Sequence, residues 1–237
     1  MNFARSLFTV SSLTVVSRIT GFFRDTLIAM FLGAGIEADA FFVAQRLPNL
    51  FRSLFAEGAF SAAFVPLYAA EAEKKGLKSA QRFAGDALAL LVTVLAPLSV
   101  IIMLFMPYAA LVIAPGYSDE PEKYALTVSF SRIAFPYLLL ISITALQSGV
   151  LNARGRFGPP AAAPIALNIV MIGGLFLAHV FKFRVGTTLS WAFVASGVVQ
   201  AGWLMISCWR ARLAIPIFYL LTRISKVTEA RCLCYIK

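Results

Sequence analysis

Charged residues are scarce in this chain, and their scarcity excludes an ordinary soluble domain. Asp, Glu, Lys and Arg together make up 14% of the sequence, whereas hydrophobic residues make up 60%. Soluble domains carry about 25% charged residues. The composition therefore predicts a polytopic membrane protein.

Residues that bind metals or carry redox chemistry are also few. The chain has three cysteines and one histidine, with no CxxC pair and no cluster of Cys and His. Such clusters are what metal and redox sites require. The sequence therefore predicts no metal and no other cofactor.

The motifs of common enzyme and ATPase classes are absent as well. The chain contains no HExxH, no GxxxxGK(S/T), no Ser/His/Asp set and no loop cluster of aspartates that could hold Mg²⁺. The sequence therefore predicts a protein that is not an enzyme. Secondary transport is the class of function that remains.

The net charge of +10 does not indicate nucleic-acid binding. Lys and Arg are scattered among short loops and apolar segments, without a basic stripe on a soluble module. The positive charge is better explained by membrane topology and by a cationic cavity.

Apolar segments long enough to cross a bilayer recur six times. A helix needs about 20 residues to cross a hydrocarbon core of about 30 Å. The sequence thus predicts an all-α membrane protein whose first span is retained rather than cleaved as a signal peptide. The expected spans are residues 6–32, 37–70, 83–113, 124–152, 160–181 and 185–208. The tail, residues 213–237, contains LAIPIFYLL, which is too short to span.

The basic residues of the connecting loops predict an orientation. Nine fall on one side of the expected topology and three on the other. Because cytoplasmic loops carry the excess of Lys and Arg, both termini are expected to be cytoplasmic. The nine are Arg5, Lys74, Lys75, Lys78, Arg82, Arg154, Arg156, Arg210 and Arg212, and the three are Lys123, Lys182 and Arg184.

The first two spans carry more polar residues than packing explains. In each span these residues recur at helical spacings, which places them on one face. Because ionisable residues in a membrane normally face a bundle interior or a wet cavity, both faces should border a polar space. They comprise Thr14, Ser17, Arg18, Gly21, Arg24 and Asp25 in the first span, and Asp39, Arg46, Asn49, Arg52, Ser53 and Glu57 in the second. A break or kink is expected near Pro48.

Arginine outnumbers acid within the spans, which indicates an anionic ligand. A guanidinium stays ionised and binds phosphate or carboxylate through a planar fork. The alternative is that an arginine pairs with an acid or reaches the interface, and for Arg46 and Arg132 both interpretations stay open. Asp39 and Glu57 are likewise open to pairing or gating roles. The arginines are Arg18, Arg24, Arg46, Arg52 and Arg132, against the acids Asp25, Asp39 and Glu57.

Two long segments resemble one transporter family. SSLTVVSRITGFFRDTLIAMFLGAG and DAFFVAQRLPNLFRSLFAEGAFSAAFVP are similar to the start of the MurJ (MviN) lipid II flippases, which belong to the multidrug/oligosaccharidyl-lipid/polysaccharide exporter superfamily. The similarity continues through APGY, FPYLLLISITALQSGVLNARGRF and PAAAPIALNIVMI. It therefore covers about residues 1–212.

The resemblance implies one lobe of a two-lobe fold, with six helices in each lobe around a central cavity. This cavity would open alternately to the two faces of the bacterial plasma membrane. The implied substrate is lipid II, an undecaprenyl-pyrophosphate-linked disaccharide-pentapeptide that is moved to the outer leaflet for peptidoglycan synthesis. Other cell-wall synthesis proteins are implied as partners. By the family pattern, Arg18, Arg24 and Arg52 would bind the pyrophosphate, and Ser17, Asp39, Asn49 and Glu57 would line or gate the cavity.

The chain also departs from that family pattern. It has residues for the first lobe only, and its tail RISKVTEARCLCYIK does not resemble the family's link to the second lobe. A truncated product, inactive alone, is therefore expected. Two alternatives stay open. One is export of another polyprenyl-pyrophosphate oligosaccharide or of a cationic drug, although the excess of arginine argues against a drug. The other is a non-transporting remnant or scaffold.

Overall fold

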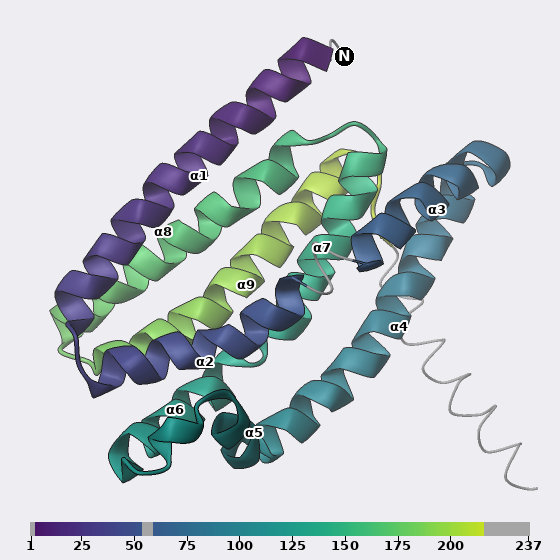
Figure 1. The fold of residues 1–237 in the computed structure, drawn as a ribbon. Coiled ribbons are helices and arrows are strands. Elements are labelled where there is room, and N and C mark those ends of the chain that lie inside the picture. The colour runs from purple at the N-terminus through teal and green to yellow at the C-terminus, as the bar shows by residue number, and fades with distance from the viewer. Residues whose placement is uncertain (1–2, 54–58, 216–237) are drawn as a thin grey trace, which may run out of the picture.

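The computed structural model describes residues 3–53 and 59–215, and every regular element in these two ranges is helical. Figure 1 shows the helices packed lengthwise against one another. In chain order they are α1 (Phe3–Leu32), α2 (Ile36–Arg52), α3 (Ala59–Lys75), α4 (Leu77–Leu104), α5 (Met106–Ile113), the short 3-10 helix η2 (Pro115–Tyr117), α6 (Pro121–Ala134), α7 (Tyr137–Ala153), α8 (Gly158–Phe181) and α9 (Val185–Arg210).

Four helical stretches in the described part of the chain are long and apolar enough to cross a membrane. They are Leu77–Leu104, Pro121–Ala153, Gly158–Phe181 and Val185–Arg210. These four overlap with the last four spans expected from the sequence, although their bounds differ. The first two expected spans correspond to α1 and to α2 with α3, which carry the charged faces.

The expected connection over residues 71–82 is instead almost entirely helical. Only Gly76 separates α3 from α4, with a φ of 85° that glycine adopts without strain. Across this turn the Ser79 hydroxyl donates a hydrogen bond to Glu71 Oε1 at 2.6 Å, and Lys75 Nζ lies 3.2 Å from the same oxygen. These two contacts lower the pKa of Glu71. Glu71 thus links the end of α3 to the start of α4 across a helical segment rather than a loop.

The expected third span is divided at Phe105, where α4 ends and α5 begins. Pro107 has no backbone N–H, so it leaves the Met103 carbonyl without its partner in the helix. Arg132 Nε donates to that carbonyl at 3.1 Å. This contact gives Arg132 a structural role. The expected fourth span is divided in the same way near Pro136, into α6 and α7, whereas α2 continues through Pro48 to Arg52.

Packing places α7 and α8 at the centre of the bundle. α8 lies between α1 and α9, and the three run side by side in Figure 1. α7 packs against α9 on one side and against α3 and α4 on another. One apolar core joins α2, α6, α8 and α9 around Phe41, Phe130, Met171 and Leu189, and a second joins α3, α4 and α7. The bundle thus holds α1, α7 and α8 around a common space.

The contact between α8 and α9 depends on a small residue at position 174. A Cβ atom added at Gly174 would lie 2.6 Å from Ala192 Cβ, whereas one added at the neighbouring Gly173 would contact nothing. We therefore expect Gly174→Ala to lower the free energy of unfolding by about 1–3 kcal/mol through overpacking. Gly173→Ala is the matched control and should raise stability by about 0.5–1 kcal/mol through the higher helix propensity of alanine. Thermal unfolding of the purified variants in detergent measures both, and equal effects would contradict the close packing.

Candidate binding cavity

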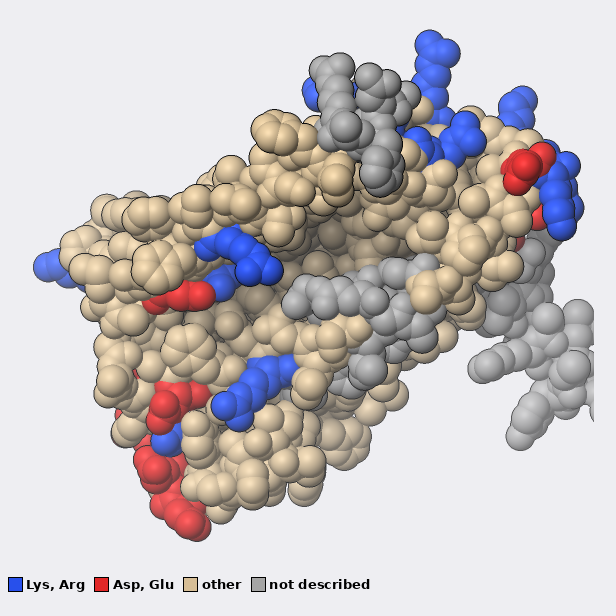
Figure 2. Space-filling view, turned by 45° about the horizontal axis from the view of Figure 1, so that its top comes forward, with Lys and Arg blue, Asp and Glu red and all other residues tan. Residues whose placement is uncertain are grey.

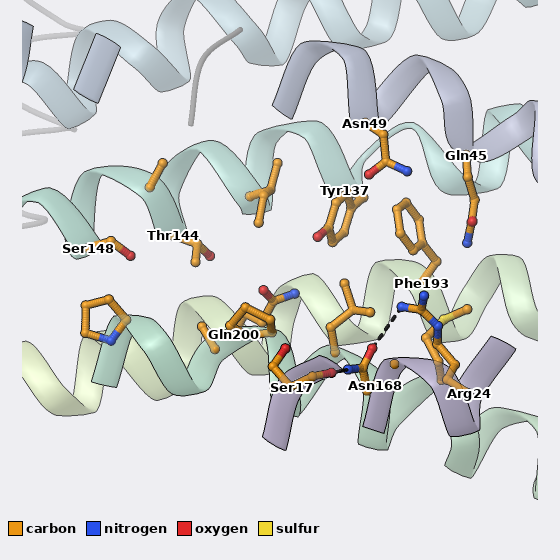
Figure 3. A pocket seen from close by; sticks show the side chains of 18 of the residues that line it. Ser17, Arg24, Gln45, Asn49, Tyr137, Thr144, Ser148, Asn168, Phe193 and Gln200 are labelled. Carbon is orange, nitrogen blue, oxygen red and sulfur yellow. Dashed lines mark hydrogen bonds between the residues drawn. The ribbon is translucent and has the colours of Figure 1, made fainter. Parts of the chain in front are cut away.

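A cavity of about 840 Å³ lies between α1, α2, α7, α8 and α9. Figure 2 shows a hollowed face with Lys and Arg side chains at its border, and Figure 3 shows the residues that line the hollow. Its polar lining residues are Ser17, Arg18, Arg24, Gln45, Asn49, Tyr137, Thr144, Ser148, Asn152, Asn168 and Gln200. The cavity is therefore a polar space inside an apolar bundle.

One face of α1 supplies the cationic side of the cavity. Ser17, Arg18, Gly21 and Arg24 all line it, as their spacing of three and four predicts. Thr14 lines an adjoining hollow of about 350 Å³ that shares Ser17 with the cavity. Arg18 is exposed and has no ion-pair partner among the described residues, so its guanidinium is available to a ligand.

Arg24 is held by contacts on both sides of its guanidinium. Its Nε and Nη2 donate to Asp25 Oδ1 at 2.9 and 2.7 Å, and its Nη1 donates to Asn168 Oδ1 at 2.8 Å. The Asp25 side chain is 62% exposed and does not line the cavity. Asp25 thus orients Arg24 while standing outside the cavity that Arg24 faces.

Asn168 of α8 connects Arg24 to the backbone of α1. The residue is 4% exposed, and its Nδ2 donates to the Ser17 carbonyl and to Thr20 Oγ1, each at 3.0 Å. Figure 3 shows it between Ser17 and Arg24. The contact with Arg24, and with it a place in the candidate site, was not expected.

The residues expected along the second span separate into different places. Asn49 lines the cavity together with Gln45. Arg46 and Ser53 instead line an adjoining hollow of about 380 Å³ along α2, which shares Gln45 and Asn49 with the cavity. The side chain of Arg52, and Glu57 altogether, lie outside the part that the structure describes. The expected single polar face therefore borders two hollows, and Arg46 is not among the residues that line the main cavity.

Asp39 forms an ion pair instead of facing the cavity. Its Oδ2 lies 2.7 Å from Lys123 Nζ, which joins the start of α2 to α6, and Lys123 also stacks on the Tyr117 ring at 4.2 Å. Of the interpretations open for Asp39, the structure favours the salt bridge. The interaction fixes the end of α2 that lies away from Asn49.

Exchange of the two charges tests this structural role of Asp39. Asp39→Asn should lower the midpoint of thermal unfolding slightly, by about 2 °C, because the carboxylate is half exposed. The double variant Asp39→Lys with Lys123→Asp should recover most of that loss, since it restores an opposite pair. If the double variant is less stable than either single variant, Asp39 acts through something other than Lys123.

The wall opposite α1 is polar but uncharged, and sequence reasoning missed most of it. Thr144, Ser148 and Asn152 follow one another at intervals of four on α7, a signal that helical periodicity could have revealed. Gln200 and Phe193 come from α9, and the Phe193 ring lies 4.0 Å from that of Tyr137. The cavity therefore presents cations on one side and neutral hydrogen-bonding groups with aromatic rings on the other.

This arrangement suits a ligand that is anionic at one end and polar but uncharged at the other. Arginine forks bind phosphate oxygens, whereas amides and hydroxyls both donate and accept hydrogen bonds. Within the described ranges no group of three or more His, Cys, Asp and Glu side chains is placed to hold a metal ion.

Comparisons with known proteins agree on one family. The family model described as "Lipid II flippase MurJ" matches residues 28–231. A probable lipid II flippase MurJ of Rhizobium tropici is 45% identical over 219 residues, which are 91% of this chain and 41% of that protein. The lipid II flippase MurJ of Burkholderia cenocepacia is 42% identical over 201 residues, which are 84% of this chain and 39% of that protein.

A solved structure also resembles the fold described above. It is the lipid II flippase MurJ in an inward closed conformation, with a TM-score of 0.68 and 28% sequence identity. The match covers 84% of this chain and 41% of that protein. The chain therefore spans about two fifths of the length of the relatives it matches.

Proposed function

The chain belongs to the MurJ family of lipid II flippases, and from this premise we propose that it is the part of such a flippase that binds the pyrophosphate of lipid II. In this proposal lipid II crosses from the inner to the outer leaflet of the bacterial plasma membrane by alternating access. The protein is then a transporter rather than an enzyme. The observation that carries the proposal is the cavity with Arg18 and Arg24 on one wall and neutral polar groups on the other.

The two arginines match the chemistry of a pyrophosphate. Each guanidinium offers a planar fork that binds two phosphate oxygens at once. Two nitrogens of Arg24 donate to Asp25, and its Nη1 donates to Asn168 at the cavity wall. Arg18 forms no ion pair with an acid among the described residues. Because the cavity lies inside an apolar bundle, the attraction between these cations and an anion is stronger than it would be in water. Arg52 is the third proposed ligand.

The neutral wall matches the remainder of the head group. The amides and hydroxyls of Gln45, Asn49, Ser148 and Asn152 line the cavity without a hydrogen-bond partner among the described residues. A disaccharide-pentapeptide presents many hydroxyl and amide groups that could pair with them. The cationic side of the cavity thus matches the pyrophosphate of the proposed substrate, and its neutral side matches the disaccharide-pentapeptide.

In the full proposal the chain crosses the membrane six times and residues 1–212 form one lobe. α1 has 30 residues, about 45 Å at 1.5 Å per residue, and it packs along the apolar α8. α2 and α3 together form the second crossing. The excess of Lys and Arg on one side of this topology supports a cytoplasmic location for both termini.

Binding by the purified chain tests the proposed substrate. The chain in lipid nanodiscs is titrated with lipid II, and then with lipid II in competition with inorganic pyrophosphate, an unrelated polyprenyl-pyrophosphate oligosaccharide or a cationic drug. We expect saturable binding that pyrophosphate and the oligosaccharide reduce and that the drug leaves unchanged. Competition by the drug would indicate a different export function. Absence of saturable binding would indicate a non-transporting remnant and would overturn the proposal.

A further inference from the structure

Another hollow lies on the opposite side of α7 from the cavity. It has a volume of about 680 Å³ and is formed by α4, α7 and α9 together with residues 214 and 215. Thr144 and Ser148 of α7 face the polar cavity, whereas Gln147 faces this second space. We call it the apolar groove, and its side walls include Leu88, Val92, Leu140, Ile143, Val198 and Met205.

The apolar groove is open toward the surrounding membrane. Val198 and Met205 line it and are 56% and 47% exposed, and Trp209 at one end is 71% exposed. An apolar groove on a helix bundle in a bilayer is filled by hydrocarbon, because lipid chains are the solvent there. The shape and lining of the groove therefore fit the chains of a membrane lipid.

Gln147 is the exception to this apolar lining. The residue is 6% exposed, and its Oε1 atom has no hydrogen-bond partner within the described part of the protein. Buried polar atoms are almost always paired, so an unpaired one indicates a missing partner. Since the oxygen can only accept, that partner must bring an N–H or O–H group into the groove.

The position of Gln147 identifies the part of a lipid that could supply this donor. The Cys208 thiol lies 3.9 Å from the Gln147 carbonyl, and α9 ends at Arg210. Gln147 is therefore level with the end of α9, where Trp209 marks the interface of the bilayer. A donor at this depth belongs to a head group and not to an acyl chain.

Two arginines at the same end of the groove complement a phosphate. Arg210 and Arg212 directly follow Trp209 and precede Ala214, and both are exposed. Neither has an acidic partner among the ion pairs of the described residues. Gln81 of α4 donates to the Arg212 carbonyl at 3.1 Å, which holds this turn against the groove.

We propose that the apolar groove binds a phospholipid of the cytoplasmic leaflet whose head group carries a hydrogen-bond donor, with phosphatidylethanolamine as the fitting example. Its chains lie along α4, α7 and α9, its phosphate lies near Arg210 and Arg212, and its ammonium donates to Gln147 Oε1. Phosphatidylcholine has the same chains and phosphate but no N–H. Selectivity between the two lipids therefore depends on Gln147.

Native mass spectrometry of the purified chain tests this assignment. The chain is released from nanodiscs that contain equal amounts of phosphatidylethanolamine and phosphatidylcholine, and the lipids that stay bound are counted. We expect about a fivefold enrichment of phosphatidylethanolamine, the size expected of one net hydrogen bond. In Gln147→Leu a lipid should stay bound with the enrichment reduced to about one, because the chains keep their groove.

A variant that fills the groove separates chain binding from head-group selection. A Cβ atom at Gly202, which lines the groove, would meet nothing within 4 Å, and the same is true of Gly173 on α8 outside it. Gly202→Leu should therefore lose the bound lipid, while the matched control Gly173→Leu keeps both the lipid and its selectivity. The proposal is overturned if the wild type shows no enrichment, if Gln147→Leu retains it, or if Gly202→Leu binds lipid as the wild type does.

Discussion

Replacement of Arg24 by alanine should lower the affinity of the chain for lipid II roughly tenfold to a hundredfold, because a charge-assisted hydrogen bond is worth about 1.5–3 kcal/mol. The Arg24 side chain is 25% exposed and is already oriented by Asp25 and Asn168, so little entropy is lost when it meets an anion. Its removal also leaves the Asp25 carboxylate without its cation, which adds repulsion against a pyrophosphate. Titration of lipid II into nanodiscs that hold each variant measures the change.

Two further substitutions show whether the effect belongs to the cavity. Arg24→Lys keeps the charge but cannot make the forked contacts to Asp25 and Asn168, and we expect it to recover only part of the affinity. Arg46→Ala is the matched control because Arg46 lines the adjoining hollow and not the cavity itself. If Arg46→Ala weakens binding as much as Arg24→Ala, the arginines act through overall charge and not through a site.

The second large effect is expected at Asn168. Asn168→Asp keeps an oxygen acceptor for Arg24 Nη1 but places a full negative charge beside it, so the cation is neutralised. It also loses the Nδ2 donor to the Ser17 carbonyl and to Thr20 Oγ1, which weakens the contact with α1. We expect a folded protein whose affinity for lipid II falls by about tenfold, comparable to the loss of one charged hydrogen bond. Lipid II titration and thermal unfolding of the same preparation separate these two consequences.

Asn168→Leu should lower stability without adding a charge to the cavity. Leucine fits an apolar bundle but leaves Thr20 and one side of Arg24 without their partner, which should cost about 1–3 kcal/mol of stability. Asn152→Asp is the control for charge alone, since Asn152 lines the same cavity without a contact to Arg24. An equal loss of affinity in Asn152→Asp would show that any added acid weakens binding, and that the contact between Asn168 and Arg24 has no special part.

Helical periodicity carried the prediction of the site along α1. Ser17, Arg18, Gly21 and Arg24 line the cavity because residues three and four apart share a helix face, whatever the helix packs against. The same reasoning worked less well on α2, where Asn49 lines both the cavity and the adjoining hollow, whereas Arg46 lines the adjoining hollow alone. One face of a helix is broad enough to border two hollows. The boundary between the two hollows depends on where the neighbouring helices pack.

By itself, the sequence determined that the protein is helical and apolar enough for a membrane, that α1 carries a cationic face, and which family it resembles. These properties are local, because composition and the spacing of residues along one helix are sufficient for them. Only the tertiary structure decided the partners of the charged residues. Arg24 meets Asn168 across 144 positions, Asp39 pairs with Lys123, and Arg132 holds the Met103 carbonyl that Pro107 leaves free. Such pairings depend on how the helices pack against one another. The spacing of residues within one helix does not predict which other helix will lie beside it.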